Sequence, residues 1–294
     1  MLHPRKVFKQ WLDGDRLLVA PGCFDGLSAR LVEEAGFEAV YLSGGAVARS
    51  MALPDIGLVT MSEIIERAAQ VAAAVTIPII ADADTGYGNA LNLVRTVREF
   101  ERTGVAAIHI EDQITPKRCG HLDGKEVIPL AAMEKKLEAA LASRRDPDFA
   151  IIARTDARAV HGLEEALERG RSFQRIGADA VFIEAPQSEV ELETVATSLP
   201  GVPLMVNLFK GGKTPLLPVS VLQRMGYRLA ILPSETQRAA IHAMRKALQH
   251  LKEQGTTEAM DQELTTFEER DRIVGLDSWQ ELEQRFLVSK RKEP

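Results

Sequence analysis

The chain has 294 residues, of which 45% are hydrophobic and 27% charged, and its formal net charge is −6. These values are typical of a globular protein with a substantial core, and the acidic balance argues against a nucleic-acid partner. Two cysteines exclude a disulfide framework, no apolar run is long enough to cross a membrane, and charges interrupt any signal-peptide core in the first 20 residues. We therefore expect a cytoplasmic, enzyme-sized protein.

Eight short apolar runs recur along the chain, and a stretch with helical spacing follows each of them. Continuous apolar runs of this length are typical of parallel strands that are buried on both faces. In chain order, the expected strands lie within residues 17–25, 39–45, 78–86, 106–113, 150–158, 180–186, 203–212 and 229–235.

The segments between these strands carry helical periodicity and end in glycine, as at 27–36 and 92–104. Eight alternating units predict an α/β protein with a (β/α)8 TIM barrel, whose active site lies at the carboxyl ends of the strands. An open doubly wound sheet is the alternative. We expect one barrel domain over residues 1–294, with C-terminal helices and a charged tail over 236–294.

Polar side chains stand at the end of every expected strand, which favours the closed barrel over the open sheet. Each of them can bind a ligand, donate or accept a hydrogen bond, or transfer a proton. They are Asp25, Ser43, Asp82, Asp84, Glu111, Asp112, Arg154, Asp156, Glu184, Asn207 and Ser234.

An acidic cluster is expected where two neighbouring strands end. Asp82 and Asp84 lie two residues apart, so their side chains should point the same way, and Glu111 follows the core-facing period of the next strand. Carboxylates that converge with no Lys or Arg between them suit a hard cation, Mg²⁺ or Mn²⁺. The alternative is that the two aspartates only cap the following helix.

A loop with a thiol, PKRCGH at 116–121, follows the second acidic strand end. Nearby cations lower the pKa of a thiol and allow it to exchange protons near neutral pH, whereas Cys23 is expected to be a core residue. Glycine supplies the mobility for the loop to cover a substrate. The alternative is a solvated basic loop with an incidental cysteine. The residues concerned are Lys117, Arg118, Cys119, Gly120 and His121.

Arginines and one glycine turn offer sites for carboxylate groups. Arg154, Arg158 and Arg238 can each bind a carboxylate with two parallel hydrogen bonds, although a surface salt bridge is the alternative for any one of them. The case is strongest for Arg154, which stands at an expected inward position of the barrel. Ser43, Gly44 and Gly45 offer a hydroxyl group and backbone N–H groups.

Taken together, these segments resemble the isocitrate lyase/phosphoenolpyruvate mutase superfamily over about residues 15–255. The KRCGH segment is similar to the short-chain lyase branch, in which a loop cysteine exchanges a proton with the substrate. The resemblance is carried by APGCFDGLSA, SGG, PDIGLVTMSE, IADADTGYGN, AIHIEDQ, PKRCGH, IIARTDA and NLFKGGKTP.

The resemblance implies a (β/α)8 barrel with bound Mg²⁺, assembled as a homotetramer (a dimer of dimers) in which partners exchange the last helix. It implies that Asp82 and Asp84 hold the metal, with Asp55 and Glu111 nearby through waters. It assigns substrate-binding roles to Ser43, Gly44, Gly45, Asp55, Lys117, Gly120, His121, Glu184, Asn207 and Arg238.

The function this implies is Mg²⁺-dependent carbon–carbon cleavage of a 2-hydroxy di- or tricarboxylate, of the 2-methylisocitrate or 2,3-dimethylmalate type. The products are pyruvate, or a related α-keto acid, and a second carboxylate. Cys119 would protonate the leaving carbanion, and Arg154 with Arg238 would stabilise it. Tyr41, Glu111 or a metal-bound water would take the hydroxyl proton.

Three alternatives stay open at this stage. One is a phosphonate-forming mutase, another is an oxaloacetate hydrolase or decarboxylase on the same site, and the third is a dicarboxylate-binding protein without catalysis. Superfamily members that cleave 2-methylisocitrate carry an extra arginine in the C-terminal tail, where this chain has Phe267. That difference favours a 2-hydroxy dicarboxylate as the substrate.

Overall fold

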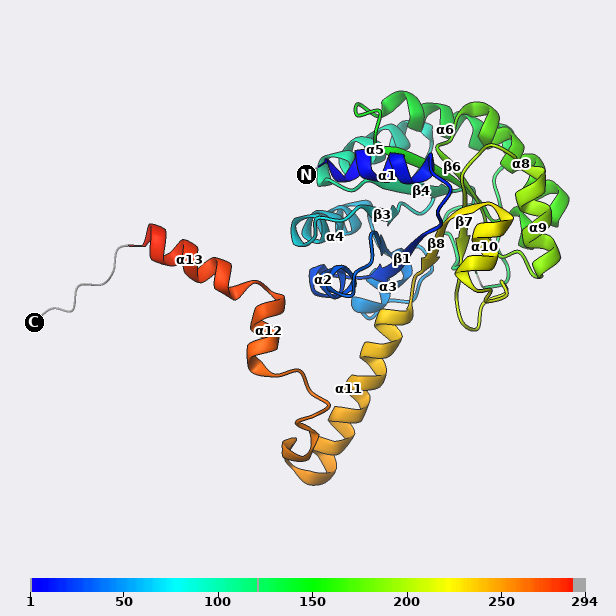
Figure 1. Cartoon of the computed structure of the whole chain (residues 1–294). Helices are drawn as coiled ribbons and strands as arrows, with labels where there is room; N and C mark the ends of the chain where they lie inside the picture. The colour runs from blue at the N-terminus through cyan, green and yellow to red at the C-terminus, as the bar shows by residue number, and fades with distance from the viewer. Residues whose placement is uncertain (1, 121, 288–294) are drawn as a thin grey trace, which may run out of the picture. The chain divides into compact units, whose positions relative to one another are not determined.

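Eight parallel strands form a closed barrel in the computed structural model, which describes residues 2–120 and 122–287 (Figure 1). Each strand pairs with its neighbours in chain order, and β1 closes the barrel against β8. The predicted (β/α)8 barrel is therefore confirmed. The strands are β1 (Leu18–Cys23), β2 (Val40–Leu42), β3 (Ile79–Asp82), β4 (Ala107–Glu111), β5 (Ala150–Thr155), β6 (Ala180–Ile183), β7 (Leu204–Asn207) and β8 (Tyr227–Leu232).

Helices surround the barrel and bury the outer faces of its strands. The predicted glycine ends are present, because Gly36, Gly104 and Gly177 have φ angles of 86°, 94° and 96°, a conformation that glycine adopts without strain. The helices are α1 (Pro4–Leu12), α2 (Gly26–Glu34), α3 (Gly44–Ser50), α4 (Met61–Ala74), α5 (Ala90–Thr103), α6 (Leu130–Ser143), α7 (Ala157–Val160), α8 (Leu163–Ile176), α9 (Glu189–Ser198) and α10 (Val219–Met225).

The amino end of the barrel is filled by apolar side chains. Phe8 and Leu12 of α1 pack against the first residues of the strands and against the interior residues Ile80 and Ile152. Burial of each large apolar side chain contributes about 1.5–3 kcal/mol to folding. Polar groups that face into the barrel are therefore concentrated at its carboxyl end.

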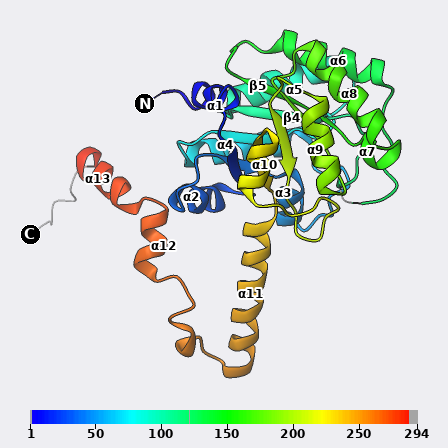
Figure 2. The same cartoon turned by 45° about the vertical axis from the view of Figure 1, so that its right-hand side comes forward.

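A second compact unit begins at Arg238, within the helix α11 (Glu235–Gln254) that was predicted at 236–253. Figure 2 shows its elements in orange and red. Many of its large apolar side chains are exposed, among them Leu248 at 65% and Trp279 at 67%. The elements that follow α11 are a 3₁₀ turn (Glu258–Met260), α12 (Phe267–Ile273) and α13 (Leu276–Phe286). In the described part of the chain, no helix has both the length and the apolar character to cross a membrane.

Candidate active site

A polar cavity of about 70 Å³ opens at the carboxyl ends of the strands, where the active sites of TIM barrels lie. A larger cavity of about 480 Å³ lies beside the amino ends of β7 and β8, but Asp13 and Arg228 are the only charged residues in its lining. We therefore regard the smaller cavity as the candidate active site. Its lining is Tyr41, Ser43, Gly45, Arg49, Asp55, Asp82, Lys117, Cys119, Gly120, Arg154, Glu184, Asn207, Phe209, Pro233 and Ser234.

Most of the residues predicted from the sequence meet at this cavity. Gly44, Asp84 and Glu111 are not part of its lining, but each lies next to a residue that is. Arg238 belongs to the second unit, and His121 lies outside the described residues, so the structure tests neither prediction. Arg49 lines the cavity and was not predicted; nothing in the sequence distinguishes it from other arginines of the helices.

The acidic turn after β3 differs from its predicted geometry. Asp82 ends the strand, but Asp84 lies beyond it in the left-handed region, with φ 46°, so the two side chains do not extend from one strand. The backbone N–H of Asp84 donates to Asp82 Oδ1 over 3.0 Å. Neither aspartate caps α5, whose cap is Asn89, so the alternative of simple helix capping is wrong.

A second expectation, that no cation lies among these acids, is wrong, because Lys117 lies between two of them. Its Nζ lies 2.6 Å from Asp55 Oδ1 and 2.7 Å from Asp84 Oδ1, because the thiol loop folds back over the acidic turn. Burial opposes the charge of Lys117, but Asp84 and Asp55 hold its pKa well above the usual value. The charge of Lys117 is therefore engaged by the acidic cluster.

The cluster still contains more acids than cations. Burial opposes ionisation of Asp82, but His109, Lys117 and Arg154 lower its pKa to about 2. Burial raises the pKa of Asp84 to about 6, and the Asp82 charge adds to this effect. Burial also raises the pKa of Glu111 well above the usual value. Burial therefore disfavours the charged forms of Asp84 and Glu111, and an added cation would stabilise them as carboxylates.

A buried pair, Tyr41 and His109, lies beneath the acids. Tyr41 Oη lies 2.8 Å from His109 Nε2 and 3.4 Å from Asp82 Oδ2. Burial lowers the pKa of His109 to about 4 and raises that of Tyr41, so both side chains are neutral near pH 7. His109 was missed, although it stands two residues before Glu111 in the same strand and therefore shares its inward face.

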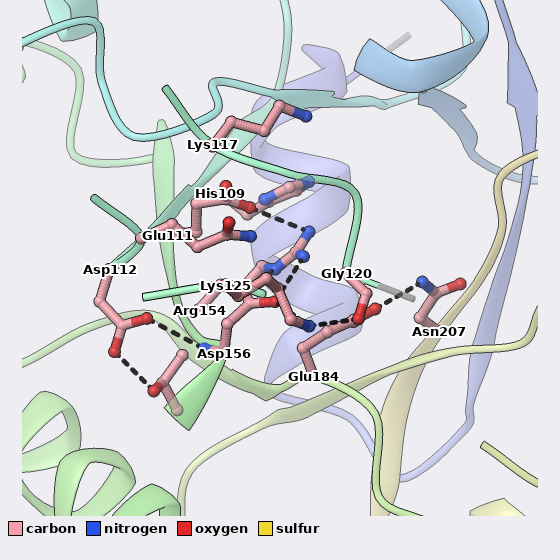
Figure 3. A network of polar contacts seen from close by, with 12 residues as sticks. His109, Glu111, Asp112, Lys117, Gly120, Lys125, Arg154, Asp156, Glu184 and Asn207 are labelled. Carbon is pink, nitrogen blue, oxygen red and sulfur yellow. Dashed lines mark hydrogen bonds and ion pairs between the residues drawn. The ribbon is translucent and has the colours of Figure 1, made fainter. Parts of the chain in front are cut away.

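Arg154 stands at the centre of the polar network in Figure 3. Its Nε lies 2.9 Å from Asp156 Oδ2, and its Nη1 lies 3.3 Å from Glu111 Oε2. Glu184 accepts a hydrogen bond from Asn207 Nδ2 over 3.2 Å in the same network. The inward position of Arg154 is as predicted. Burial opposes its charge, but Asp156 and Glu111 hold the pKa of Arg154 well above its usual value.

Two other predicted polar residues have structural contacts away from the cavity. Arg158 forms a salt bridge with Glu191, with its Nε 2.8 Å from Oε2 and its Nη2 2.6 Å from Oε1. The salt-bridge alternative therefore holds for this arginine. Asp112 accepts hydrogen bonds from the Thr155 hydroxyl at 2.6 Å and from Arg169 at 3.0 Å, and it is fully buried. Asp112 therefore stabilises the barrel wall behind the cavity.

The glycine turn after β2 is required by close packing. A Cβ atom on Gly44 would lie 2.8 Å from Asp82 Oδ2, and one on Gly45 would lie 2.7 Å from Asp55 Oδ2. The Ser43 side chain accepts a hydrogen bond from the Ala46 N–H over 3.2 Å. The turn thus brings backbone and acids together on one side of the cavity.

The two cysteines have the different environments predicted for them. Cys119 is half-buried and lines the cavity, whereas Cys23 is fully buried in the core. Burial raises the pKa of the Cys23 thiol, which makes that thiol unreactive. Cys119 is therefore the only thiol of the chain positioned to meet a ligand in the cavity.

Fold and site together define a TIM-barrel enzyme with an acidic, thiol-containing site at the carboxyl ends of its strands. Residues 8–252 match the phosphoenolpyruvate phosphomutase family. The chain belongs to this family, within the phosphoenolpyruvate mutase/isocitrate lyase superfamily, and the resemblance seen in the sequence is confirmed.

Several relatives that match most of the chain are named as lyases. The chain is 41% identical to 2,3-dimethylmalate lyase of Eubacterium barkeri, over 96% of this chain and 98% of that protein. It is 44% identical to a probable 2-methylisocitrate lyase of Corynebacterium glutamicum, over 92% and 88%. A solved structure of 2,3-dimethylmalate lyase superposes with a TM-score of 0.92 and 36% identity, covering 97% of this chain and 96% of that one.

Proposed function

We propose that this protein is a lyase that cleaves the carbon–carbon bond of a 2-hydroxy dicarboxylate or tricarboxylate and releases pyruvate. The observation that carries the proposal is the cavity itself, which brings the thiol of Cys119, the guanidinium of Arg154 and the acid Asp82 together. The sequence similarity to 2,3-dimethylmalate lyase and 2-methylisocitrate lyase supports this chemistry.

In the proposed reaction, a base takes the hydroxyl proton and the C2–C3 bond breaks, so that C2 becomes the keto carbon of pyruvate. Burial raises the pKa of Glu111, but the Arg154 guanidinium lies 3.3 Å from its carboxyl group and favours the ionised form, so Glu111 is the better candidate for the base. The raised pKa of Tyr41 disfavours the phenolate that it would need.

The electron pair of the broken bond stays on C3, beside the second carboxylate. Arg154 would stabilise this charge, and its contacts with Asp156 and Glu111 fix the guanidinium before the substrate binds. The Cys119 S–H would then protonate C3, and the thiol and Glu111 return to their starting forms by proton exchange with water. Atoms and charge balance without an external oxidant or reductant.

The residues present fit a Mg²⁺ ion held by one or two carboxylates and water. Among the described residues, no three His, Cys, Asp or Glu side chains form a complete metal cage, but Mg²⁺ binds commonly through few protein ligands. Glu111 Oε1 is buried without a hydrogen-bond partner in the described residues, and the donors are oxygens. Asp82 and Asp84 would hold the ion, which, when bound, would polarise the 2-hydroxyl and its carboxylate. A solved relative, phosphonopyruvate hydrolase, was captured with oxalate and Mg²⁺.

The class of reaction is tested by incubating the protein and Mg²⁺ with a panel of substrates and identifying the products by NMR. The panel holds 2,3-dimethylmalate, 2-methylisocitrate, isocitrate, oxaloacetate and phosphonopyruvate. We expect pyruvate with propionate from the first compound, or pyruvate with succinate from the second. Oxalate and acetate from oxaloacetate would instead indicate the activity of oxaloacetate acetylhydrolase, a structural neighbour with a TM-score of 0.91.

We expect the protein to be a homotetramer, built as a dimer of dimers that exchange helices of the second unit. The exposed apolar side chains of that unit, including Phe267 at 71% and Phe286 at 66%, would be covered in such an assembly. Sedimentation at micromolar concentration should therefore show a species of about four times the chain mass of 32.3 kDa. A single species at the chain mass would contradict this expectation.

A further inference from the structure

The loop that carries Cys119 is anchored by backbone contacts at its two ends. Gln113 pairs with Val127 in an antiparallel bridge, and the Ile114 N–H donates to the Glu126 carbonyl over 2.9 Å. The Gln113 amide also exchanges two hydrogen bonds with the backbone of Arg118, at 2.8 and 2.9 Å. The segment Cys119–Gly120, called the thiol segment below, begins one residue after this anchor.

Lys125 reaches from the far end of the loop to the thiol segment. Its Nζ lies 2.9 Å from Asp156 Oδ1 and donates a hydrogen bond to the Gly120 carbonyl. The side chains of Lys125 and Asp156 are 1% and 0% exposed. Burying a lysine is costly unless its charge is paired and its donors are used. The proposed reaction gives this lysine no chemical role, so its burial needs another explanation.

Asp156 joins Lys125 to the arginine of the cavity. Arg154 Nε lies 2.9 Å from Asp156 Oδ2, and Arg154 Nη2 donates to Asp156 Oδ1 over 3.2 Å (Figure 3). Gly120 packs directly on the same network, since a Cβ atom on it would lie 2.7 Å from Arg154 Nη2. One buried carboxylate thus holds both the lysine that binds the thiol segment and the arginine beneath that segment.

We propose that Lys125 is a positioning residue that ties the thiol segment to the Arg154–Asp156 ion pair, so that the Cys119 thiol is held over the reacting carbon. The inference rests on the proposed role of Cys119. Neutralising Asp156 does not require the lysine, because Arg154 already donates two hydrogen bonds to that carboxylate. The contact that only Lys125 adds is the one to the Gly120 carbonyl.

The test replaces Lys125 in the full chain. Lys125→Met keeps the length and most of the volume of the side chain but removes the ammonium, so we expect kcat to fall by about 10–100-fold, the size of a misplaced catalytic group. KM and the affinity for oxalate with Mg²⁺ should change little, and Lys125→Arg should restore part of kcat. The matched control is Lys213→Met, which removes a lysine that pairs with Asp123 on the exposed side of the same loop, at 2.7 Å.

A second readout does not depend on turnover. The rate at which iodoacetamide alkylates Cys119, followed by mass spectrometry, should change several-fold in Lys125→Met and stay constant in Lys213→Met. The buried Cys23 serves as the internal control for folding, because it becomes reactive only if the barrel opens.

Equal kcat and equal alkylation rates in the two methionine variants would overturn the proposal. Should Lys125→Met expose Cys23, the comparison passes to Lys125→Arg. In that case, a Lys125→Arg variant that keeps Cys23 protected and restores at least part of kcat supports the positioning role. A Lys125→Arg variant that keeps Cys23 protected but is as impaired as Lys125→Met contradicts it. If the wild-type protein cleaves no substrate of the panel, the proposed function fails while the alkylation rates still decide the role of Lys125.

Discussion

Cys119→Ser is expected to lower turnover by about 10²–10⁴-fold, the range typical of a lost general acid. A hydroxyl group is a far weaker acid than a thiol near neutral pH, so the carbanion would no longer receive its proton from this position. The half-buried thiol lines the cavity, and the substitution changes no charge and little volume. Steady-state kinetics with the best substrate of the panel measures the effect.

The matched control for this variant is Cys23→Ala. Cys23 is fully buried among apolar residues, and its thiol is not part of the cavity. Turnover should stay near the wild-type value in this variant, and affinity for oxalate with Mg²⁺ should be similar in both variants. Equal turnover in the wild-type protein and Cys119→Ser would refute the proton-transfer role and favour a mutase or decarboxylase that works without a thiol.

Asp84→Asn is expected to lower turnover and the affinity for Mg²⁺ by at least about 100-fold. Loss of a residue that only contacts a metal ligand lowers affinity by about 10–100-fold, so loss of a direct ligand should have a larger effect. Asparagine is the better choice than alanine, because Asp84 has a φ of 46°, and asparagine tolerates the left-handed region. Asp84 is only 8% exposed, so the substitution changes a buried group rather than one at the solvent-facing mouth of the barrel. Lys117 keeps its pairing with Asp55, which limits the loss of stability.

Calorimetric titration with Mg²⁺ alone measures the affinity, and kinetics at saturating Mg²⁺ measures turnover. The matched control is Asp123→Asn, which neutralises an exposed acid of the thiol loop that pairs with Lys213. Its Mg²⁺ affinity should equal that of the wild-type protein. Full activity of the wild-type protein after exhaustive chelation would show that the acidic cluster does not act through a metal ion.

The barrel could be predicted because its signals are local. Each strand is a short apolar run, such as the one that ends in Asp82, and glycines such as Gly104 mark the helix ends that precede the next strand. The (β/α)8 topology then places the strand ends at one opening of the barrel. This rule alone predicts that four strand-end residues lie at one site: Glu111, Arg154, Glu184 and Asn207.

The contacts of the loop could not be predicted in the same way. Lys117 and Lys125 stand in a segment without periodicity, and their long side chains reach acids that are distant in the sequence. Only the fold shows that Lys117 pairs with two acids of the acidic cluster and that Lys125 pairs with Asp156. The left-handed backbone at Asp84 was equally hidden, because an aspartate after a strand more often continues the chain in an extended conformation.

His109 could have been found from the sequence. It alternates with Ile108 and Ile110 in β4 and stands on the same face as Glu111, so a polar residue at this position predicts a group inside the barrel. Its contact with Tyr41 explains why two neutral, buried polar side chains lie under the acidic cluster. Reading the face of each strand residue by residue would have added His109 to Tyr41, which was already predicted.

The most direct test of the proposed cleavage is to run the reaction in D2O with 2,3-dimethylmalate and Mg²⁺ and to analyse both products by NMR. If the C2–C3 bond breaks and C3 is protonated in the cavity, each turnover gives one pyruvate and one propionate, and the propionate carries a single deuterium at the carbon next to its carboxylate. If 2,3-dimethylmalate stays intact, the same experiment is run with the other compounds of the panel. A panel that stays wholly intact under conditions in which the protein binds oxalate with Mg²⁺, or that gives no pyruvate with a second carboxylate, would contradict a carbon–carbon lyase that releases pyruvate.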